Sequence, residues 1–444
     1  MGRNIRKGIN MYTIDQNLLE EFRNEFDQDK NAKNAQAACA RTEIKDLVFL
    51  PLNAARLNGD FSVEVKTSAV TAQEKSGRCW MFAALNIVRE RIGAKCGIKD
   101  FELSENYAAF YDKLEKANNV LDLAVKHADD SLDDRMMEYI LDGFHDGGYW
   151  DMAADIIRKY GAVPKWVMPE TYQSSHTATF MKMLNSLIRK DVCELRKMVR
   201  EGKNPDERRK EMLAEIYRAE CIVFGQPPKC FDFEYRDKDG KFHADRNLSP
   251  KAFLEKYADF DPDAFITVTN EPTERKKMNS YYRFHYIGSM AESNVRCLNL
   301  PMEELKKLSI AQLKDGVPVW FGCDSGAYGD RLSGVWDPES FAYGNVLGGA
   351  DFFMNKKDRL EYRDSFATHA MILTGVNLDE NGKPDRWKIE NSWGKEVGKN
   401  GYFVCSDHYF DEFVYEVIID RKYLNEAQKA LLDEEPYEIM PWQV

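Results

Sequence analysis

Hydrophobic and polar positions follow two different patterns along the chain, and the change comes near residue 315. Before it, apolar residues recur at helical spacing, as at Met81, Leu85, Val88 and Ile92. After it, short apolar runs such as "HAMILTGV" and "RWKIENSW" are broken by Gly, Asn and Asp, which is typical of antiparallel strands. The chain is therefore expected to be an α+β protein with a helical part first and a β-rich part last.

Other segments predict further elements of the helical part. Residues 14–27 carry Leu18, Leu19, Phe22 and Phe26 on one helical face. Residues 177–222 predict two charged helices around the breaker "GKNPDE". The stretch "FDFEYRDKDGKFHAD" predicts a hairpin that turns at Asp239-Gly240. Ser249, followed by proline, is expected to cap the next helix.

Composition narrows the class of protein. The 444 residues are 43% hydrophobic and 31% charged, which is ordinary for a globular protein, and the net charge is −12. That acidity argues against nucleic acid as a partner, although residues 182–210 hold ten Lys or Arg against five Asp or Glu; a solvated helix face is the preferred interpretation. The first residues lack the apolar core of a signal peptide and no run is long enough to span a membrane, so a cytoplasmic location is expected.

Nine cysteines are scattered without a C-x-x-C pair, which argues against a zinc ribbon or a disulfide framework. Cys79 differs from the others because it stands where a helix should begin, in "TAQEKSGRCWMFAALN". A helix N-terminus favours negative charge and lowers a thiol pKa, and only the thiolate is a good nucleophile. The alternative is a buried structural cysteine.

Two polar residues stand in apolar frames of the β-rich part. His369 precedes the run "AMILTGV", and Asn391 follows the next predicted strand. A hairpin between these strands would bring the imidazole and the amide side by side, with Trp393 placed to shield them. The amide oxygen would then accept from one ring nitrogen while the other faces the sulfur.

Gln73 completes this set from the loop before Cys79. Acyl transfer builds charge on a carbonyl oxygen, and preorganised donors stabilise that charge. The side-chain amide of Gln73 and the backbone N–H of Cys79 are candidates for such an oxyanion hole. Alone, Gln73 would be an ordinary loop residue.

These stretches carry a family resemblance. "QEKSGRCWMFAALN", "ATHAMILTGV" and "ENSWG" occur in the order found in papain-like cysteine peptidases, and "DGGYWDMAADIIRKYGAVPK" and "GYFVCSDHYFDEFVYEV" resemble the bleomycin hydrolase and bacterial aminopeptidase C family. The resemblance covers roughly residues 15 to 442 and implies a papain-like fold.

The resemblance also implies roles for single residues. Cys79 is implied as the nucleophile, His369 as the general base and acid, Asn391 as its orienting partner and Gln73 as the oxyanion donor. Gly147 and Gly148 resemble the glycine stretch that binds substrate backbone, although a simple turn before a helix explains them equally well. Trp393 and Val444 are further candidates for substrate contact. Such peptidases require no metal and no cofactor.

The spacing favours that family over simpler papain-like enzymes. His369 follows Cys79 by 290 residues, against about 130 to 150 in papain itself, so a large and mostly helical insertion is expected. The predicted parts are an N-terminal helical arm at 1–60, the helical half with the nucleophile at 61–176, an inserted hook-like region of helices and hairpin at 177–284, the β-rich half at 285–430, and a C-terminal arm reaching toward the cleft at 431–444.

The family implies an intracellular aminopeptidase acting on small peptides, assembled as a homohexamer. In such enzymes the terminal carboxylate lies in the cleft and meets the free amino group of the substrate. Tails of the family run several residues past a Pro-Trp pair, whereas here Val444 is two residues beyond Trp442. A short tail would open the cleft to longer or N-blocked peptides, which makes an oligopeptide endopeptidase the alternative.

Two further alternatives come from other classes of protein. A catalytically silent ring-forming or nucleic-acid-binding homologue would keep the fold, but the intact set of Gln73, Cys79, His369 and Asn391 argues against it. A transglutaminase-like acyltransferase would use an acidic third member in place of Asn391.

Overall fold

Two units make up the part of the chain that the computed structural model describes, residues 13–291 and 293–444. Unit 1 holds residues 13–56 together with 338–354, and unit 2 holds residues 57–337 and 355–444. All the candidate site residues named above belong to unit 2.

Unit 1 is built from short helices. These are α1 (Gln16–Gln28), α2 (Lys30–Cys39), α3 (Ile44–Val48), α4 (Pro51–Ala54) and α14 (Tyr343–Val346). The predicted helix at 14–27 is confirmed as α1, which begins after Asp15, whose carboxylate accepts the Leu18 N–H at 2.9 Å. The ring of Phe49 contacts that of Phe341 at a centroid distance of 5.4 Å, so the 338–354 segment packs within this unit.

Unit 2 contains most of the helices, including all the long ones among the described residues. They are α5 (Cys79–Cys96), α6 (Glu105–Lys126), α7 (Arg135–Asp142), α8 (Trp150–Tyr160), α9 (Tyr172–Ser175), α10 (Ala178–Arg200), α11 (Asp206–Phe224), α12 (Pro250–Tyr257), α13 (Met302–Lys314), α15 (Lys356–Glu361), α16 (Asp407–Phe413) and α17 (Glu426–Leu431). Unit 2 also has the short 3-10 helices η2 (Pro262–Ala264), η4 (Arg421–Tyr423) and η5 (Pro441–Gln443), whereas η3 (Pro338–Ser340) belongs to unit 1 and η1 (Ala55–Leu57) lies at the boundary of the two units.

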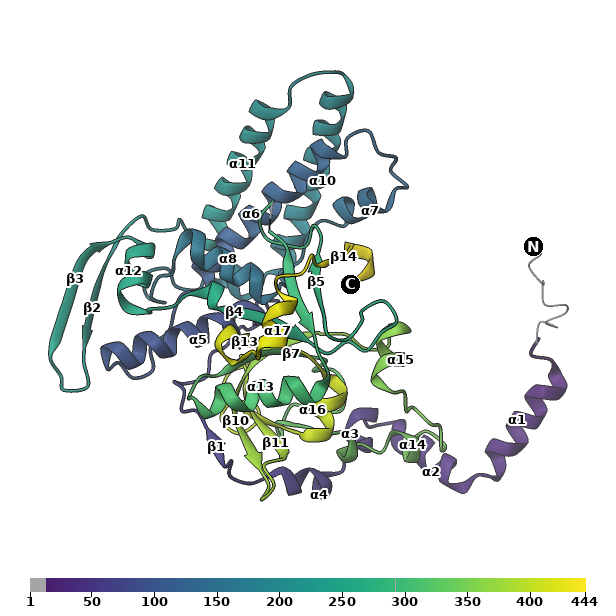
Figure 1. Cartoon of the computed structure of the whole chain (residues 1–444). Coiled ribbons are helices and arrows are strands. Elements are labelled where there is room, and N and C mark those ends of the chain that lie inside the picture. The colour runs from purple at the N-terminus through teal and green to yellow at the C-terminus, as the bar shows by residue number, and fades with distance from the viewer. Residues whose placement is uncertain (1–12, 292) are drawn as a thin grey trace. The chain divides into compact units, whose positions relative to one another are not determined.

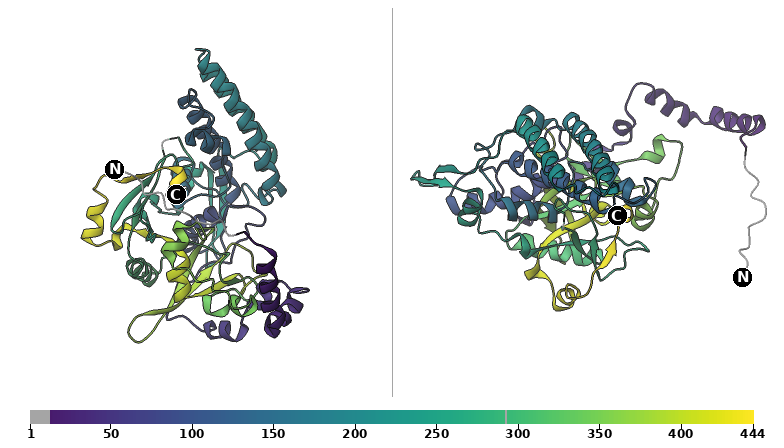
Figure 2. Two further views of the ribbon diagram at one scale, coloured as in Figure 1. Left: turned by 90° about the vertical axis from the view of Figure 1, so that its right-hand side faces the viewer. Right: turned by 90° about the horizontal axis from the view of Figure 1, so that it is seen from above.

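The two predicted charged helices are confirmed as α10 and α11. They run side by side, pack against α6, and project from the body of unit 2 (Figures 1 and 2). The apolar stripe of α10, including Leu184, Ile188 and Val192, is buried in this packing, while charged residues cover the remaining surface. The predicted cap Ser249 accepts the Ala252 N–H at 3.2 Å at the start of α12.

Most strands belong to a 12-stranded sheet within the described part of unit 2. The strands are β1 (Val63–Glu64), β4 (Phe265–Thr269), β5 (Ser280–Phe284), β6 (Val295–Asn299), β7 (Val319–Cys323), β8 (Gly329–Asp330), β9 (Val335–Trp336), β10 (His369–Leu378), β11 (Pro384–Glu390), β12 (Tyr402–Ser406), β13 (Val414–Asp420) and β14 (Tyr437–Ile439). They follow the order β14-β5-β6-β4-β13-β7-β10-β11-β12-β9-β8, and β1 pairs with β10. The β-rich C-terminal part predicted from the sequence is confirmed.

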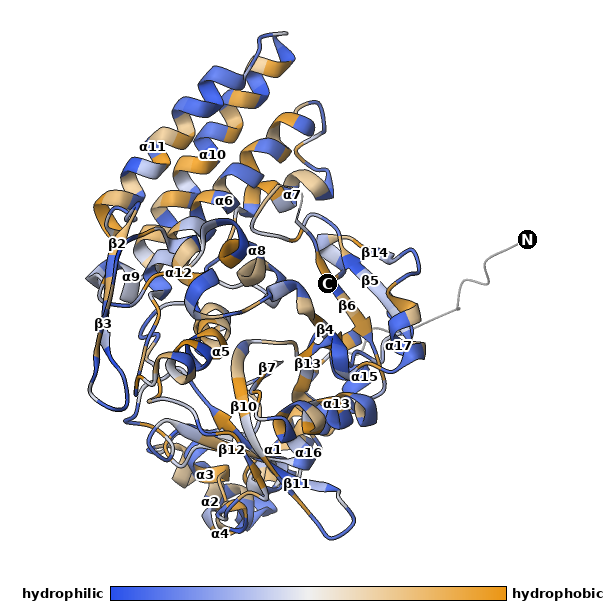
Figure 3. Ribbon diagram, turned by 60° about the vertical axis from the view of Figure 1, so that its left-hand side comes forward, coloured by the Kyte–Doolittle hydropathy of each residue, from blue (hydrophilic) through white to orange (hydrophobic). Residues whose placement is uncertain are grey.

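A separate hairpin is formed by β2 (Phe231–Arg236) and β3 (Phe242–Leu248), which are antiparallel and connected through Asp239-Gly240 as predicted. Gly240 has a φ of 78°, a left-handed conformation that glycine adopts without steric cost. In Figure 3 the tip of this hairpin is hydrophilic, whereas β10, β13 and β4 are mostly hydrophobic.

The central strands of the sheet separate two hydrophobic cores. Side chains alternate between the faces of a strand; on β10, Ala370 and Ile372 join the core around α5, whereas Met371 and Leu373 join the core around α13. The sheet therefore has an α5 face and an α13 face, and α5 lies directly against β10. This contact brings the start of α5 to the start of β10. The five sequence boundaries proposed above remain predictions.

Candidate active site

Helix α5 fixes the position of the thiol. Cys79 is its first residue, and nearly every residue from Trp80 to Ile92 is buried, so the helix is buried on all sides and runs through the interior. It ends at Gly97, whose φ of 65° is the left-handed conformation of a helix C-cap. Cys79 itself is half-buried at the open end of the helix.

The loop before Cys79 holds Gln73 in a defined orientation. Gln73 is 7% exposed, its Nε2 donates to the Ser76 carbonyl at 2.7 Å, and its Oε1 accepts from Ser392 Oγ at 2.7 Å. The Gln73 N–H also donates to the Ser392 carbonyl at 2.8 Å. Because the amide oxygen accepts from a hydroxyl, the amide nitrogen is the group that donates to Ser76, and it carries a second N–H beyond that bond.

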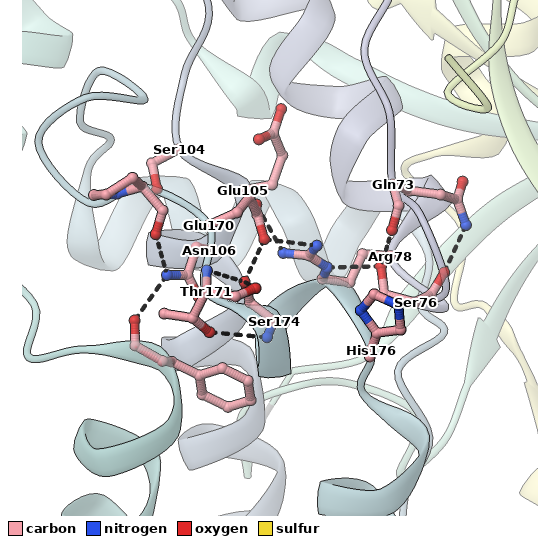
Figure 4. Close-up of polar contacts among 12 residues, drawn as sticks. Gln73, Ser76, Arg78, Ser104, Glu105, Asn106, Glu170, Thr171, Ser174 and His176 are labelled. Atoms are coloured by element: carbon pink, nitrogen blue, oxygen red, sulfur yellow. Dashed lines mark hydrogen bonds and ion pairs between the residues drawn. The ribbon is translucent and has the colours of Figure 1, made fainter. Parts of the chain in front are cut away.

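A buried ion pair supports the same loop (Figure 4). The Arg78 guanidinium forms two parallel hydrogen bonds to Glu170, at 3.1 and 2.9 Å, and its Nε donates to Ser76 Oγ at 2.9 Å. Ser76 Oγ in turn donates to the Gln73 carbonyl at 2.7 Å. Burial alone would raise the pKa of Glu170, but Arg78 and Lys165 hold it below its usual range.

The candidate base lies at the end of the sheet. His369 is the first residue of β10 and Asn391 directly follows β11, and these strands pair in antiparallel fashion. The His369 Nε2–H donates to Asn391 Oδ1 at 2.9 Å, since an amide oxygen can only accept. The Trp393 ring stacks on the imidazole at a centroid distance of 4.8 Å and an angle of 24°. The hairpin expected from the sequence therefore brings these three side chains together.

The thiol and the imidazole meet in one cavity of about 470 Å³ lined by both residues. Hydrogen bonding by the Ala370 backbone reaches the Cys79 sulfur, so the residue next to His369 touches the thiol. Burial raises the pKa of Cys79 and lowers that of His369 to about 4, because an isolated charge is disfavoured at either position. Moving the proton from sulfur to imidazole creates two charges that attract each other, a change that neither pKa alone describes.

The glycine stretch forms another part of the cavity wall. Gly147 and Gly148 both line it. A Cβ at Gly148 would approach the Trp80 ring to 2.7 Å, whereas one at Gly147 would meet nothing within 4 Å. The Gly147 carbonyl accepts from Lys116 Nζ at 2.7 Å, and this bond fixes the position of the Gly147 backbone. The requirement for glycine at 148 is therefore one of packing, and Gly147 leaves backbone accessible to a ligand.

Asp146 links the glycine stretch to the loop before Cys79, and the sequence analysis missed it. Its carboxylate pairs with Lys113 at 2.7 Å and accepts the Gly77 N–H at 3.2 Å, and its carbonyl accepts from Trp80 Nε1 at 2.7 Å. Burial would raise the pKa of Asp146, but Lys113 holds it below the usual range. Its position in "HDGGYW", beside the glycines, is the one signal that marked it.

Other predicted site residues lie outside this cavity. Among the described residues that line it, Gln73, Asn391, Trp393 and Val444 are absent. Val444 lines a second cavity of about 780 Å³. Four residues line both cavities, so the two adjoin; they are Tyr149, Phe366, Ala367 and Glu416.

Neither a candidate metal site nor a candidate membrane span is present in residues 13–291 and 293–444. Among these described residues, no group of three or more His, Cys, Asp or Glu side chains is arranged to hold a metal ion. No helix in that part of the chain combines the length and the apolar character needed to cross a bilayer.

The fold and the site define a class. A thiol at the start of a buried helix, beside a His–Asn pair at the end of antiparallel strands and with a glutamine in the preceding loop, is the arrangement of papain-like cysteine peptidases. The comparisons with known proteins agree with this class. The model of the Peptidase C1-like family matches residues 13–444.

Individual relatives match over nearly their whole length. Aminopeptidase C of Listeria innocua is 43% identical over 97% of both chains, and aminopeptidase G of Lactobacillus delbrueckii is 40% identical over 96% of this chain and 97% of that one. The crystal structure of PepW from Lactobacillus rhamnosis superposes with a TM-score of 0.94 at 41% identity, covering 97% of this chain and 98% of that one. The chain belongs to the Peptidase C1-like family of cysteine peptidases.

Proposed function

We propose that this protein hydrolyses small peptides from their N-terminal end, with Cys79 as nucleophile, His369 as general base and acid, Asn391 as its orienting partner and Gln73 as oxyanion donor. One observation carries the assignment. The Nε2 of His369 is bound to Asn391 at 2.9 Å, while the neighbouring Ala370 backbone reaches the Cys79 sulfur. Since Nε2 is bound to Asn391, Nδ1 is the ring nitrogen that remains to accept the proton of the thiol.

The reaction follows from these positions. As the sulfur attacks the peptide carbonyl, its proton passes to His369, and the carbonyl oxygen takes the negative charge between the Gln73 amide and the Cys79 N–H. The imidazolium then protonates the leaving amine, and the C–N bond breaks to give a thioester on Cys79. The same imidazole then deprotonates a water molecule, which attacks the thioester carbonyl. The C–S bond breaks to release the carboxylic acid product, and the imidazolium returns its proton to the sulfur.

Other parts of the proposal concern binding and assembly. Gly147 and Gly148 offer backbone to the substrate, Trp393 shields the His–Asn pair, and Val444 borders the adjoining cavity where the substrate's amino end would extend. We also propose a homohexamer and a cytoplasmic location, in keeping with relatives named aminopeptidase C.

Paired fluorogenic peptides test this function. They are identical except for a free or an acylated N-terminus and are assayed under reducing conditions, with a Cys79→Ala variant as control. Cleavage of the free form alone supports an aminopeptidase, and comparable cleavage of the blocked form means an endopeptidase. If neither is cut and Cys79 resists alkylation, the catalytic assignment is wrong.

A further inference from the structure

One carboxyl group that lines the cavity of Cys79 and His369, called the catalytic cavity from here on, has no role in the reaction described above. Glu416, on β13, is 7% exposed and lines both the catalytic cavity and the adjoining one. It is the one acidic residue among the described residues that line the catalytic cavity. A buried carboxyl aimed into a peptide-binding cavity needs an explanation, because burial of an ionisable group without a partner is costly.

The strand register directs this carboxyl toward the reacting atoms. Glu416 pairs with Gly322 on β7, and Gly322 pairs with Ala370 on β10, so the three residues form one row across the sheet. Trp320, Ile372 and Ile418, each two positions along from a member of this row, belong to the α5 core, so the row lies on the α5 face. Neighbouring strands lie about 4.8 Å apart, which puts the Glu416 backbone roughly 10 Å from that of Ala370.

Gly322 makes room for the Glu416 side chain to extend along this row. A Cβ at Gly322 would lie 2.5 Å from Glu416 Oε1 and 2.8 Å from its Cγ. The carboxyl therefore passes over the glycine and points in the direction of Ala370, whose backbone touches the Cys79 sulfur. Any larger residue at 322 would push it aside.

No described residue neutralises this carboxyl directly. Within residues 13–291 and 293–444, no hydrogen bond or ion pair to the Glu416 carboxylate is found. The positive charge of Lys276 favours the carboxylate form of Glu416, but Lys276 forms its ion pair with Glu271. Burial, followed by the like charges of Glu271 and Asp151, raises the pKa of Glu416 to about 8. The surroundings therefore disfavour the charged form of Glu416 in the empty site, and a cationic ligand would stabilise its carboxylate.

We propose that Glu416 binds an ammonium group of the peptide substrate. Peptides that carry this group on the N-terminal side of the scissile bond would therefore be bound in preference to peptides that lack it. The proposal rests on the peptidase function proposed above. The ammonium group comes either from the substrate's N-terminus or from a lysine side chain near it. Either would enter from the adjoining cavity and lie between Glu416 and the sulfur.

Binding of this kind has a definite pH dependence. Of the groups that act on Glu416, Glu271 and Asp151 favour its protonated form, Lys276 favours the carboxylate, and the Tyr149 hydroxyl stays neutral because burial raises its pKa. At pH 6 the empty site is protonated, so binding an ammonium must release a proton, and affinity rises as the pH rises toward 8. A substrate's N-terminal ammonium, with a pKa of about 7.7–8.0, loses its charge above that pH, whereas a lysine side chain keeps it.

Replacement of Glu416 by glutamine tests the proposal. The Glu416→Gln variant keeps the shape and removes the charge, so KM for a peptide with a free amino group is expected to rise roughly 10- to 100-fold with little change in kcat. Its increase in affinity between pH 6 and 8 should also disappear. The matched control is Glu220→Gln on α11, because Glu220 is a fully buried carboxyl without a hydrogen-bond partner that lines neither cavity.

Direct binding identifies the source of the ammonium group. Cys79→Ala and Cys79→Ala/Glu416→Gln proteins are titrated calorimetrically with a free-amine peptide, its desamino analogue, and a desamino analogue that carries lysine. A preference for the free amine, or for the lysine peptide, that is lost in the double variant assigns Glu416 to that group. A Gly322→Ala variant on the neighbouring strand β7 adds a methyl group that displaces the Glu416 carboxyl, so it should show the same loss of ammonium preference.

The outcomes separate this inference from the proposed function. If the wild-type enzyme cleaves peptides and Glu416→Gln keeps KM within twofold at every pH, the inference is overturned while the peptidase function stands. If the wild-type protein cleaves nothing under reducing conditions, the function itself has failed, and loss of ammonium preference in the calorimetric pair would still support a cation-binding role for Glu416.

Discussion

The proposed nucleophile and the proposed base of this site are held in place by different kinds of interaction. Around Cys79 the loop is tied down by buried charged side chains, with Arg78 on Glu170 and Asp146 on Lys113. Around His369 the backbone ladders of β7 and β11 flank β10 on both sides. One side therefore depends on a few side chains and the other on main-chain pairing.

The difference has a consequence for how each side tolerates change. A buried ion pair that loses one partner leaves an uncompensated charge, whereas a strand that loses one side chain keeps its backbone hydrogen bonds. Substitutions on the nucleophile side should therefore reduce stability, and substitutions on the base side should reduce activity in a protein that stays folded. Three experiments test this contrast.

The largest effect is expected from Arg78→Met. The variant leaves the half-buried Glu170 carboxylate without its bidentate partner, and we expect a loss of about 3–5 kcal/mol in the free energy of unfolding. Urea denaturation followed by circular dichroism measures it. An Arg78→Met/Glu170→Met double variant should recover part of the loss; a double variant as unstable as the single one would contradict the ion-pair explanation.

A smaller effect, on activity and not on folding, is expected from Asn391→Ala. His369 loses the acceptor that orients it. A hydrogen bond made by a charged group, such as the imidazolium formed during the reaction, is worth about 1.5–3 kcal/mol, so kcat should fall roughly 10- to 100-fold. The urea midpoint should change little, because β10 keeps both neighbouring strands. Asn377→Ala, farther along the same strand, is the control; a fall in kcat of similar size there would mean that the strand and not the imidazole is affected.

The smallest effect is expected from Ser392→Ala, which removes a link between the two sides. Ser392 belongs to the segment after β11, and its hydroxyl holds the Gln73 amide oxygen at 2.7 Å. Its loss frees the Gln73 side chain to rotate at a cost of about 1 kcal/mol, so kcat should fall about fivefold with KM unchanged. Exposed Ser333→Ala provides the baseline. A change in KM alone would point to substrate binding in place of oxyanion stabilisation.

Local sequence signals predicted much of the site. The helix beginning at Cys79 and the strand pair carrying His369 and Asn391 could be identified because each depends on short-range pattern. The lowered thiol pKa expected from the helix N-terminus was wrong for the isolated group, because burial outweighs the helix in the folded protein. Periodicity reports which face is apolar but not how completely a site is buried.

Contacts distant in sequence could not be predicted. Arg78 meets Glu170 across 92 positions, and nothing in either local frame selects the other. Glu416 stands in "VYEVIID", which reads as an ordinary strand; its exposure to the cavity follows from its register with Gly322. Likewise, residues 338–354 pack with the N-terminal helices of unit 1 although they lie within the β-rich stretch of the sequence.

His369 follows Cys79 by 290 positions, and this separation also sets an order of events at the ribosome. At about 5 to 20 residues per second, the thiol emerges roughly 15 to 60 s before the imidazole, and the helical half can begin to fold meanwhile. Throughout that interval the nascent protein carries a cysteine with no base beside it. Under the proposed mechanism, a chain that stalls or is released early is an inert fragment. Peptidase activity then arises only once translation has passed the strand pair that carries His369 and Asn391.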